Sequence, residues 1–279
     1  MYEYLSDIQR PIAIDGYINF GDDWRMNLSL EQYEKLNPCS EIEHAGSRMI
    51  FYTPTIFTRW RVESIYSKEP WTLEWIATFE ADEVLIDVGA NVGMYSIWAA
   101  ATRKARVFAF EPESQNYALL NRNIVLNKLY GRVKAYCVGL SDQGGLTDLH
   151  IADTRPGGSC HTVGEALDYK LEPLETLFAQ GCVASRLDEL VSAKAVPIPN
   201  HIKIDVDGLE PKVVAGAMET LRNPEVKSLL IETNLNLQDH REMVTKLNNL
   251  GFRHDPEQVR RAMRNEGPFK GVAEHVFKR

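Results

Sequence analysis

The sequence predicts a doubly wound α/β fold, in which a mostly parallel sheet is covered by helices on both faces and preceded by an N-terminal cap. From residue 84 onward, short apolar runs alternate with stretches of helical periodicity, which is typical of parallel βαβ units. The first run, residues 84–88, is mostly apolar, as a strand buried on both faces should be, and it passes directly into a glycine-containing turn. Because βαβ crossovers have a nearly invariant hand, the alternation predicts the doubly wound topology.

The sheet domain is expected to span residues 81–279, and its elements can be assigned in order. A strand is expected where a short apolar run is bounded by turn or polar residues, and a helix where apolar residues recur at intervals of three or four. The expected strands are residues 84–88, 106–110, 132–138, 201–206, 226–232 and, at the edge of the sheet, 271–278. The expected helices are residues 94–102, 114–128, 211–221 and 239–250.

Residues 139–200 interrupt this alternation. They carry two Gly-Gly pairs and four prolines, a composition that is typical of turns and loops. Within them, residues 146–152 are expected as a strand and residues 185–191 as a short helix. We therefore expect an insertion at the edge of the sheet where ligands bind.

The N-terminal segment, residues 1–80, has a different texture. It holds four of the five tryptophans and shows little periodicity. Short strands are expected at residues 49–52 and 56–62, and a helix from Pro70, a residue suited to the first helical position. We expect a cap or lid and not an independent domain. The alternative is an oligomerisation surface, so a homo-oligomer stays open.

The composition limits the possible partners. With 44% hydrophobic and 25% charged residues, the chain resembles an ordinary soluble globular protein. Its net charge of −8 argues against nucleic-acid binding, which requires a basic face. A local basic patch is the alternative, and its members would be Arg59, Arg61, Arg260, Arg261 and Arg264.

Other global features predict a cytoplasmic protein. No run approaches the ~18 apolar residues that span a bilayer, so no membrane span is expected. The N-terminus lacks the basic and apolar regions of a signal peptide. The four cysteines show no paired spacing, which fits a reducing compartment.

The turn after the first strand points to a ligand site. Asp87 lies near the end of that strand, and Gly89 and Gly93 follow before the next helix begins. Glycines permit close approach of the backbone to a ligand, and a helix N-terminus offers unpaired N–H groups. An acid beside such a turn suits a ligand that carries an ammonium group and a carboxylate. The alternative is a plain strand-to-helix turn.

Two further polar positions follow neighbouring strands. Glu111 leaves the second strand about 20 residues after the glycine turn, where an acidic side chain can accept both hydroxyl groups of a ribose. Ser141 and Asp142 follow the third strand, where their polar groups could meet an adenine amine. A β-turn containing Asp142 is the alternative. With Asp87, these positions predict a nucleoside site at the carboxyl ends of the first three strands.

The fourth strand is charged where a central strand should be apolar. Period two places Lys203, Asp205 and Asp207 on one face of it. Such a face is costly in a buried strand unless it is paired or functional. A Lys203–Asp205 ion pair is one explanation. The other is a cluster of Asp205, Asp207 and Glu210 at the edge where ligands bind.

The fifth strand also ends in polar residues, which include Glu232 and Asn234. Oxygens of Asp205, Glu232 and Asn234 could together bind a hard divalent cation. Such a metal would acidify a substrate hydroxyl. The alternative is a wet cleft lined by the same groups.

Taken in order, these motifs resemble those of the FkbM-type methyltransferases, a branch of the class I, Rossmann-like family that uses S-adenosylmethionine (SAM). The matching pieces are LIDVGANVGMYS (85–96), FAFEPE (108–113), GLSDQGG (139–145), GGS (157–159), RLDEL (186–190) and IKIDVDGLEPKVVAGA (202–217). KEPWTLEW (68–75) resembles the segment before the glycine turn in that family, and the likeness covers about residues 66–235. One departure is Asp207, where the family commonly has Glu.

The resemblance implies a seven-stranded sheet with the last strand antiparallel, SAM at the ends of the first three strands and, usually, O-methylation. By position it assigns the methionine end of SAM to Asp87, Gly89, Asn91 and Gly93, the ribose to Glu111, and the adenine region to Asp142. It also implies that Glu69 and Thr72 help to close the pocket.

The reaction expected from this resemblance is an in-line attack on the methyl group of SAM by a hydroxyl of a sugar, glycan or secondary metabolite. Positioning contributes most to such a step, and a poor nucleophile needs a base. Asp205 and Asp207 are the candidates, with His161 as a further one, although a loop histidine can also be a plain surface residue. Two other functions stay open. One is an NAD-binding oxidoreductase, which is disfavoured because the spacing G-x-x-x-G lacks a glycine of the dinucleotide motif. The other is a non-catalytic binding protein that has kept the fold.

Overall fold

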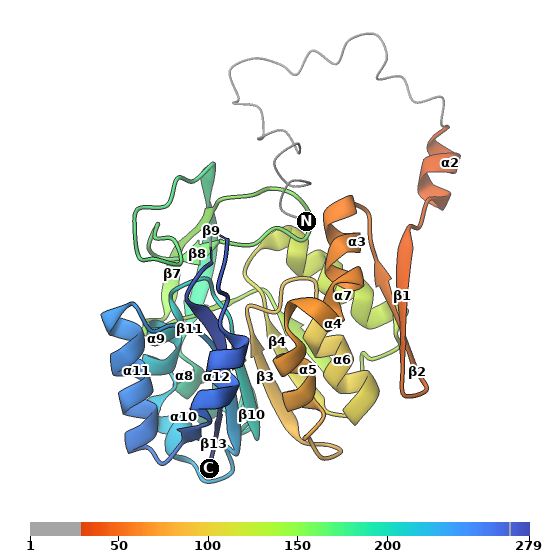
Figure 1. Ribbon diagram of the computed structural model, residues 1–279. Coiled ribbons are helices and arrows are strands. Elements are labelled where there is room, and N and C mark those ends of the chain that lie inside the picture. Colours follow the sequence, from red (N-terminus) through yellow and green to blue (C-terminus); the bar gives the residue numbers. More distant parts are fainter. Residues whose placement is uncertain (1–28, 268) are drawn as a thin grey trace. The chain divides into compact units, whose positions relative to one another are not determined.

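The computed structural model describes residues 29–267 and 269–279 (Figure 1). The described residues fall into two units, each described by itself. One holds the helix α2 (Leu30–Lys35). The other runs from Pro38 to Arg279, so residues 38–80 of the expected cap belong to the same compact unit as the sheet domain.

A seven-stranded sheet with the order β12-β13-β11-β10-β3-β4-β5 forms the centre of the larger unit. Its parallel strands are β3 (Val84–Val88), β4 (Arg106–Phe110), β5 (Val133–Tyr136), β10 (His201–Ile204) and β11 (Ser228–Asn234). β13 (Val272–Lys278) pairs antiparallel with β11. The predicted fold class is therefore confirmed, with seven strands and an antiparallel last strand.

One detail of the predicted sheet was wrong. β13 is not the edge strand, because β12 (Arg253–His254) pairs with its outer side. The chain reverses at Gly251, whose φ of 94° lies in the left-handed region, and adds this two-residue strand before it returns as β13. Nothing in the apolar pattern of so short a strand distinguishes it from a loop.

Helices cover both faces of the sheet (Figure 1). One face carries α5 (Pro70–Ile76), α6 (Met94–Arg103) and α7 (Ser114–Leu126). The other carries α8 (Leu187–Ser192), α9 (Glu210–Ala215), α10 (Met218–Arg222) and α11 (Gln238–Asn249). Leu85 enters the first core and its neighbour Ile86 the second, because successive side chains of a strand point to opposite faces.

The helix predicted at residues 211–221 is broken into α9 and α10. The break falls at Gly216 and Ala217, between the two helices. A Cβ on Gly216 would stand only 2.0 Å from the carbonyl oxygen of Ser141. The backbone therefore passes close to the turn after the third strand, a tertiary contact that helical periodicity does not report.

The segment in front of the sheet packs on the first face. β1 (Cys39–His44) and β2 (Ser47–Tyr52) form an antiparallel hairpin, which confirms the strand predicted at residues 49–52. The strand predicted at residues 56–62 was wrong, since these residues form α3 (Ile56–Glu63). A capping box decides the conformation: the side chain of Thr55 accepts from the N–H of Thr58, and that of Thr58 from the N–H of Thr55. α4 (Ile65–Lys68) and α5, the helix predicted from Pro70, follow.

The expected insertion forms a second sheet. Its four strands, in the order β6-β9-β7-β8, are β6 (Gly139–Leu140), β7 (Gly145–Ile151), β8 (Thr162–Val163) and β9 (Phe178–Ser185). The strand predicted at residues 146–152 and the helix at 185–191 are confirmed as β7 and α8. We call the connection between β7 and β8, residues 152–161, the Gly-Gly loop.

The last described helix along the chain, α12 (Pro256–Ala262), connects β12 to β13. Over the described ranges, no helix has both the length and the apolar character needed to cross a lipid bilayer.

Candidate active site

The glycine turn and the end of the fourth strand meet at one edge of the sheet. β3 and β10 are neighbours, and the last residues of both, Val88 and Ile204, are paired in register. Gly89 then turns with a φ of 77°, and a Cβ on it would lie 1.9 Å from the carbonyl oxygen of Asp205. The turn after β3 and the acidic segment after β10 therefore contact each other directly.

Asp87 is an unusual buried acid. Its side chain is on β3 and the residue is 1% exposed. Oδ2 accepts a hydrogen bond of 2.6 Å from the hydroxyl of Ser96, while Oδ1 has no partner within residues 29–267 and 269–279. Burial raises the pKa of this carboxyl, against the attraction of Lys203. Because buried polar atoms are nearly always paired, the orphaned oxygen points to a donor supplied by a ligand.

Asn91 belongs to this turn, and Glu111 lies beside it. Glu111 is buried, and its two oxygens accept hydrogen bonds from the N–H groups of Asn91 (2.7 Å) and Glu113 (2.9 Å). Burial raises the pKa of Glu111 to about 7. Each carboxylate oxygen has a second lone pair, so the side chain can still accept hydroxyl groups. Gly93 has a φ of 86° and packs so closely on Leu120 that a Cβ would come within 2.4 Å of it.

Glu69 and Thr72 lie at the start of α5, and the structure brings Glu69 toward the same site. The carboxylate of Glu69 is buried, pairs with Lys68 at 2.7 Å and accepts from Thr72 at 3.4 Å. Although burial opposes ionisation, the positive charges of Lys68 and Lys203 hold the pKa of Glu69 below its usual value. Glu69 is also among the charges that act on Asp87.

Ser141 and Asp142 follow β6, a strand of the second sheet and not of the central one. The N–H of Ser141 donates to Ser185, and its hydroxyl lies 3.2 Å from a carboxylate oxygen of Asp142. The close approach to Gly216 fixes this turn against α9 and α10. The assignment of the turn to adenine stays a prediction.

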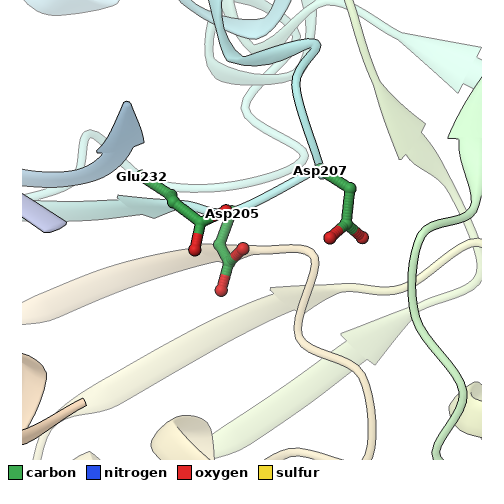
Figure 2. A group of neighbouring side chains, drawn as sticks. All are labelled: Asp205, Asp207 and Glu232. Atoms are coloured by element: carbon green, nitrogen blue, oxygen red, sulfur yellow. The ribbon is translucent and has the colours of Figure 1, made fainter. Parts of the chain in front are cut away.

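Three carboxylates gather where β10 has ended and β11 nears its end, as Figure 2 shows. Asp205, Asp207 and Glu232 each offer an oxygen, and these oxygens lie within 4.8 Å of one another. The predicted ion pair exists as well, since Lys203 lies 2.8 Å from Asp205. The ion-pair explanation of the charged strand is therefore confirmed. The acids also form a cluster, but its third member is Glu232 and not the expected Glu210.

A further cation of this region is Arg264, which follows α12. It lies 2.7 Å from Glu232 and 3.0 Å from Glu274 on β13. Even so, burial and the neighbouring charge of Asp205 raise the pKa of both Asp207 and Glu232. Acids perturbed by burial and by one another are typical of functional sites.

The metal ligands predicted from the sequence are only partly brought together. Asp205 and Glu232 belong to the acidic cluster, whereas Asn234 accepts from the N–H of Asn236 at 3.1 Å through its side-chain oxygen. Asp207 takes the third place in the cluster. Three carboxylate oxygens suit a hard cation, but two of the acids already pair with Lys203 and Arg264, so a metal stays a prediction.

Two other candidates have roles that differ from those expected. Glu210 accepts from the N–H groups of Val206 and Gly208 and thereby holds the turn before α9, and burial raises its pKa to about 8. The Nδ1 of His161 accepts from the N–H of Ala152 at 3.3 Å. In that tautomer the neutral ring carries its proton on Nε2, which is buried without a partner in the described part of the chain, so this nitrogen is a donor and not a base.

Two residues that contact the Gly-Gly loop were not predicted from the sequence. Asn116 was not considered, and Arg61 was considered only as part of a basic patch. Both donate to backbone carbonyls of that loop.

The basic patch of arginines expected as the alternative from the sequence is not found as a free surface, because most of its members have their own partners. These are Glu63 for Arg59, Gly157 for Arg61, Glu257 for Arg260 and Glu232 for Arg264.

Comparison with known proteins identifies the family of this chain. The model of the methyltransferase FkbM domain matches residues 87–254. The hexuronic acid methyltransferase AglP of Haloferax volcanii is 27% identical over 205 residues, which cover 74% of this chain and 77% of AglP. The 31-O-demethyl-FK506 methyltransferase FkbM of Streptomyces tacrolimicus is 26% identical over 173 residues, or 54% of this chain and 65% of that protein. Among solved structures, M. jannaschii TYW2 in complex with AdoMet shares 13% identity at a TM-score of 0.40, over 88% of each chain.

Proposed function

The chain belongs to the FkbM-domain family of SAM-dependent methyltransferases, and we propose that it transfers the methyl group of SAM to a hydroxyl oxygen of a sugar acid or a related glycan. One observation carries this proposal. The unpartnered buried oxygen of Asp87 and the acidic cluster around Asp205 lie at adjoining strand ends, which contact each other through Gly89. A donor site and a base are thus neighbours.

The residues at the end of β3 fit the amino acid end of SAM. The orphaned Oδ1 of Asp87 is an acceptor for the ammonium group. The turn from Gly89 to Gly93 leads into α6, whose N-terminus has unpaired N–H groups for the carboxylate. When bound, SAM supplies a methyl group on a positively charged sulfur.

The remaining cofactor residues take the nucleoside and close the site. Glu111 accepts the ribose hydroxyl groups, and Ser141 and Asp142 face the adenine. Glu69 and Thr72, at the start of α5, close the pocket on the side of Lys203, whose charge acts on Glu69.

The acidic cluster supplies the base for the acceptor. As the hydroxyl oxygen bonds to the methyl carbon, the bond from that carbon to sulfur breaks, and the hydroxyl proton passes to a carboxylate. Asp205 is the first candidate, because Lys203 holds its Oδ2 at 2.8 Å and fixes the side chain. Asp207 is the second. General-base assistance of this kind contributes about 10²–10⁴-fold.

A sugar acid is the acceptor class we favour. AglP, a hexuronic acid methyltransferase by name, matches over the larger share of both chains. The FkbM relative acts, by name, on demethyl-FK506, so a secondary metabolite hydroxyl is the second candidate.

The test is a transfer assay with methyl-labelled SAM and the purified full chain. Acceptors are free hexuronic acids, oligosaccharides that contain them and a hydroxylated macrolide, with the products located by mass spectrometry and NMR. The proposal predicts label on a hydroxyl oxygen of a uronic acid residue. Label on nitrogen or carbon, or binding of NAD without binding of SAM, would overturn it.

A further inference from the structure

The Gly-Gly loop is held to the donor side of the site by side chains from three elements. Asn91, in the glycine turn, donates to the carbonyl of Gly158 at 2.6 Å. Asn116 of α7 donates to the same carbonyl at 3.0 Å and accepts from the N–H of Gly157 at 2.8 Å. Arg61 of α3 donates to the carbonyl of Gly157 at 2.6 Å. Every group in this set meets the loop backbone, so the contacts fix its path regardless of its side chains.

The other end of the same loop reaches the acceptor side. The N–H of Cys160 donates to Oδ2 of Asp207 at 2.8 Å. Both residues have positive φ values, 65° for Cys160 and 56° for Asp207. Residues other than glycine adopt this conformation at a cost and keep it only where their surroundings fix it. The orientation of Asp207 therefore depends on where the loop lies.

Asn116 is committed to this loop. It is 1% exposed, in the first turn of α7, where its own N–H is held by the carboxylate of Glu113. The hydrogen bonds of its side chain go to Gly157 and Gly158. A buried amide is costly unless it is hydrogen-bonded, and the hydrogen bonds that offset this cost for Asn116 are made to the backbone of the Gly-Gly loop.

We propose that Asn116 is a positioning residue for methyl transfer: it holds the Gly-Gly loop between the donor turn at Asn91 and the acid at Asp207, so that the two halves of the site stay in register. The inference rests on the proposed function. Displacement of reacting groups by about 1 Å costs on the order of 10²-fold in rate. Loss of the hydrogen bonds between Asn116 and the Gly-Gly loop therefore slows turnover more than it weakens binding of the cosubstrate.

The test compares Asn116→Asp with Asn121→Asp. The first keeps the size of the side chain and the acceptor for Gly157, but sets a carboxylate oxygen against the carbonyl of Gly158. The second makes the same change in the same helix, where the amide donates to the carbonyl of Tyr117 in the preceding turn. We expect kcat to fall about 10- to 100-fold for Asn116→Asp while the Kd for S-adenosylhomocysteine changes less than about fivefold. Asn121→Asp should leave both within about twofold.

A second variant covers the case in which Asn116→Asp fails to fold. Gly157→Ala should displace the loop while it leaves Asn116 unchanged, since Gly157 has a φ of 86° and a Cβ on it would lie 2.9 Å from Thr58. It should show the same split between kcat and Kd. A variant that folds and keeps kcat within about twofold of the wild type would overturn the inference.

Hydrogen exchange separates this inference from the proposed function. Independently of any acceptor, Asn116→Asp should speed amide exchange at Cys160, whose N–H is bonded to Asp207, by at least about tenfold. If the wild type transferred no methyl group, the proposed function would fail, and unchanged exchange at Cys160 would still overturn the positioning role.

Discussion

The carbonyl oxygen of Asp205 lies where a side chain on Gly89 would begin, because a Cβ on Gly89 would stand 1.9 Å from it. Gly89 belongs to the turn that we assign to the methyl donor, and Asp205 to the acidic cluster that we assign to the acceptor. Backbone meets backbone between them. The distance between the two halves of the site is therefore set by the sheet and not by adjustable side chains.

Replacing Gly89 by alanine should destabilise the protein. The methyl group would overlap the carbonyl of Asp205, and the φ of 77° would be strained for any residue with a Cβ. We expect a loss of at least about 2 kcal/mol in the free energy of unfolding, measured by urea denaturation. Gly181→Ala on β9 is the control, since nothing lies within 4 Å of its added Cβ. Equal stabilities of the two variants would contradict the close packing.

Replacing Asp205 by asparagine should remove turnover and spare binding of the cosubstrate. The amide keeps the volume and leaves an oxygen for Lys203, which is 2% exposed and would otherwise be a buried charge without its closest partner. We expect kcat to fall by about 10²–10⁴-fold, the usual contribution of a general base, with the Kd for SAM within about tenfold. Asp148→Asn, on the exposed part of β7, serves as the matched control. If Asp205→Asn kept kcat within about threefold, the base would lie elsewhere.

The buried histidine of β13 predicts a loss of stability in acid. His275 is 0% exposed, and neither of its ring nitrogens has a partner among the residues that the structure describes. Burial, with the neighbouring His254 and His240, lowers its pKa from 6.5 to about 3. A lowered pKa in the folded state means that its contribution to stability is complete above pH 6.5 and declines as the pH falls toward 3.

This effect can be isolated with His275→Leu. Between pH 7 and pH 5, the wild type should lose about 2 kcal/mol of unfolding free energy relative to the variant, because only the unfolded wild type takes up the additional proton. Urea denaturation at both pH values measures the difference. A difference between the two proteins that is the same at pH 7 and pH 5 would show that His275 titrates normally in the fold.

The parts of the site that follow directly from strand ends could be predicted from the sequence. Asp87, Glu111 and Asp205 each follow or end an apolar run, and the parallel arrangement of those runs brings their carboxyl ends to one edge. Local pattern is sufficient there, because the strand fixes where its last side chain lies.

The parts that depend on long-range packing could not be predicted. Arg264 pairs with Glu232, which is 32 residues earlier in the chain, and no local pattern links a residue after α12 to the end of β11. The buried amide of Asn116 looks in the sequence like any polar residue of a helix. The apolar and β-branched residues of the segment 56–62 predict a strand, whereas the capping box formed by Thr55 and Thr58 begins the helix α3 there.

Calorimetric titration of S-adenosylhomocysteine into the wild type and into Asp87→Asn tests the donor site most directly. We expect saturable binding to the wild type and a Kd about 10- to 100-fold weaker for the variant, because one charge-assisted hydrogen bond to the ammonium group is lost. Folded wild-type protein that releases no heat with this ligand, or a variant that binds it equally well, would contradict the assignment of the donor site to Asp87.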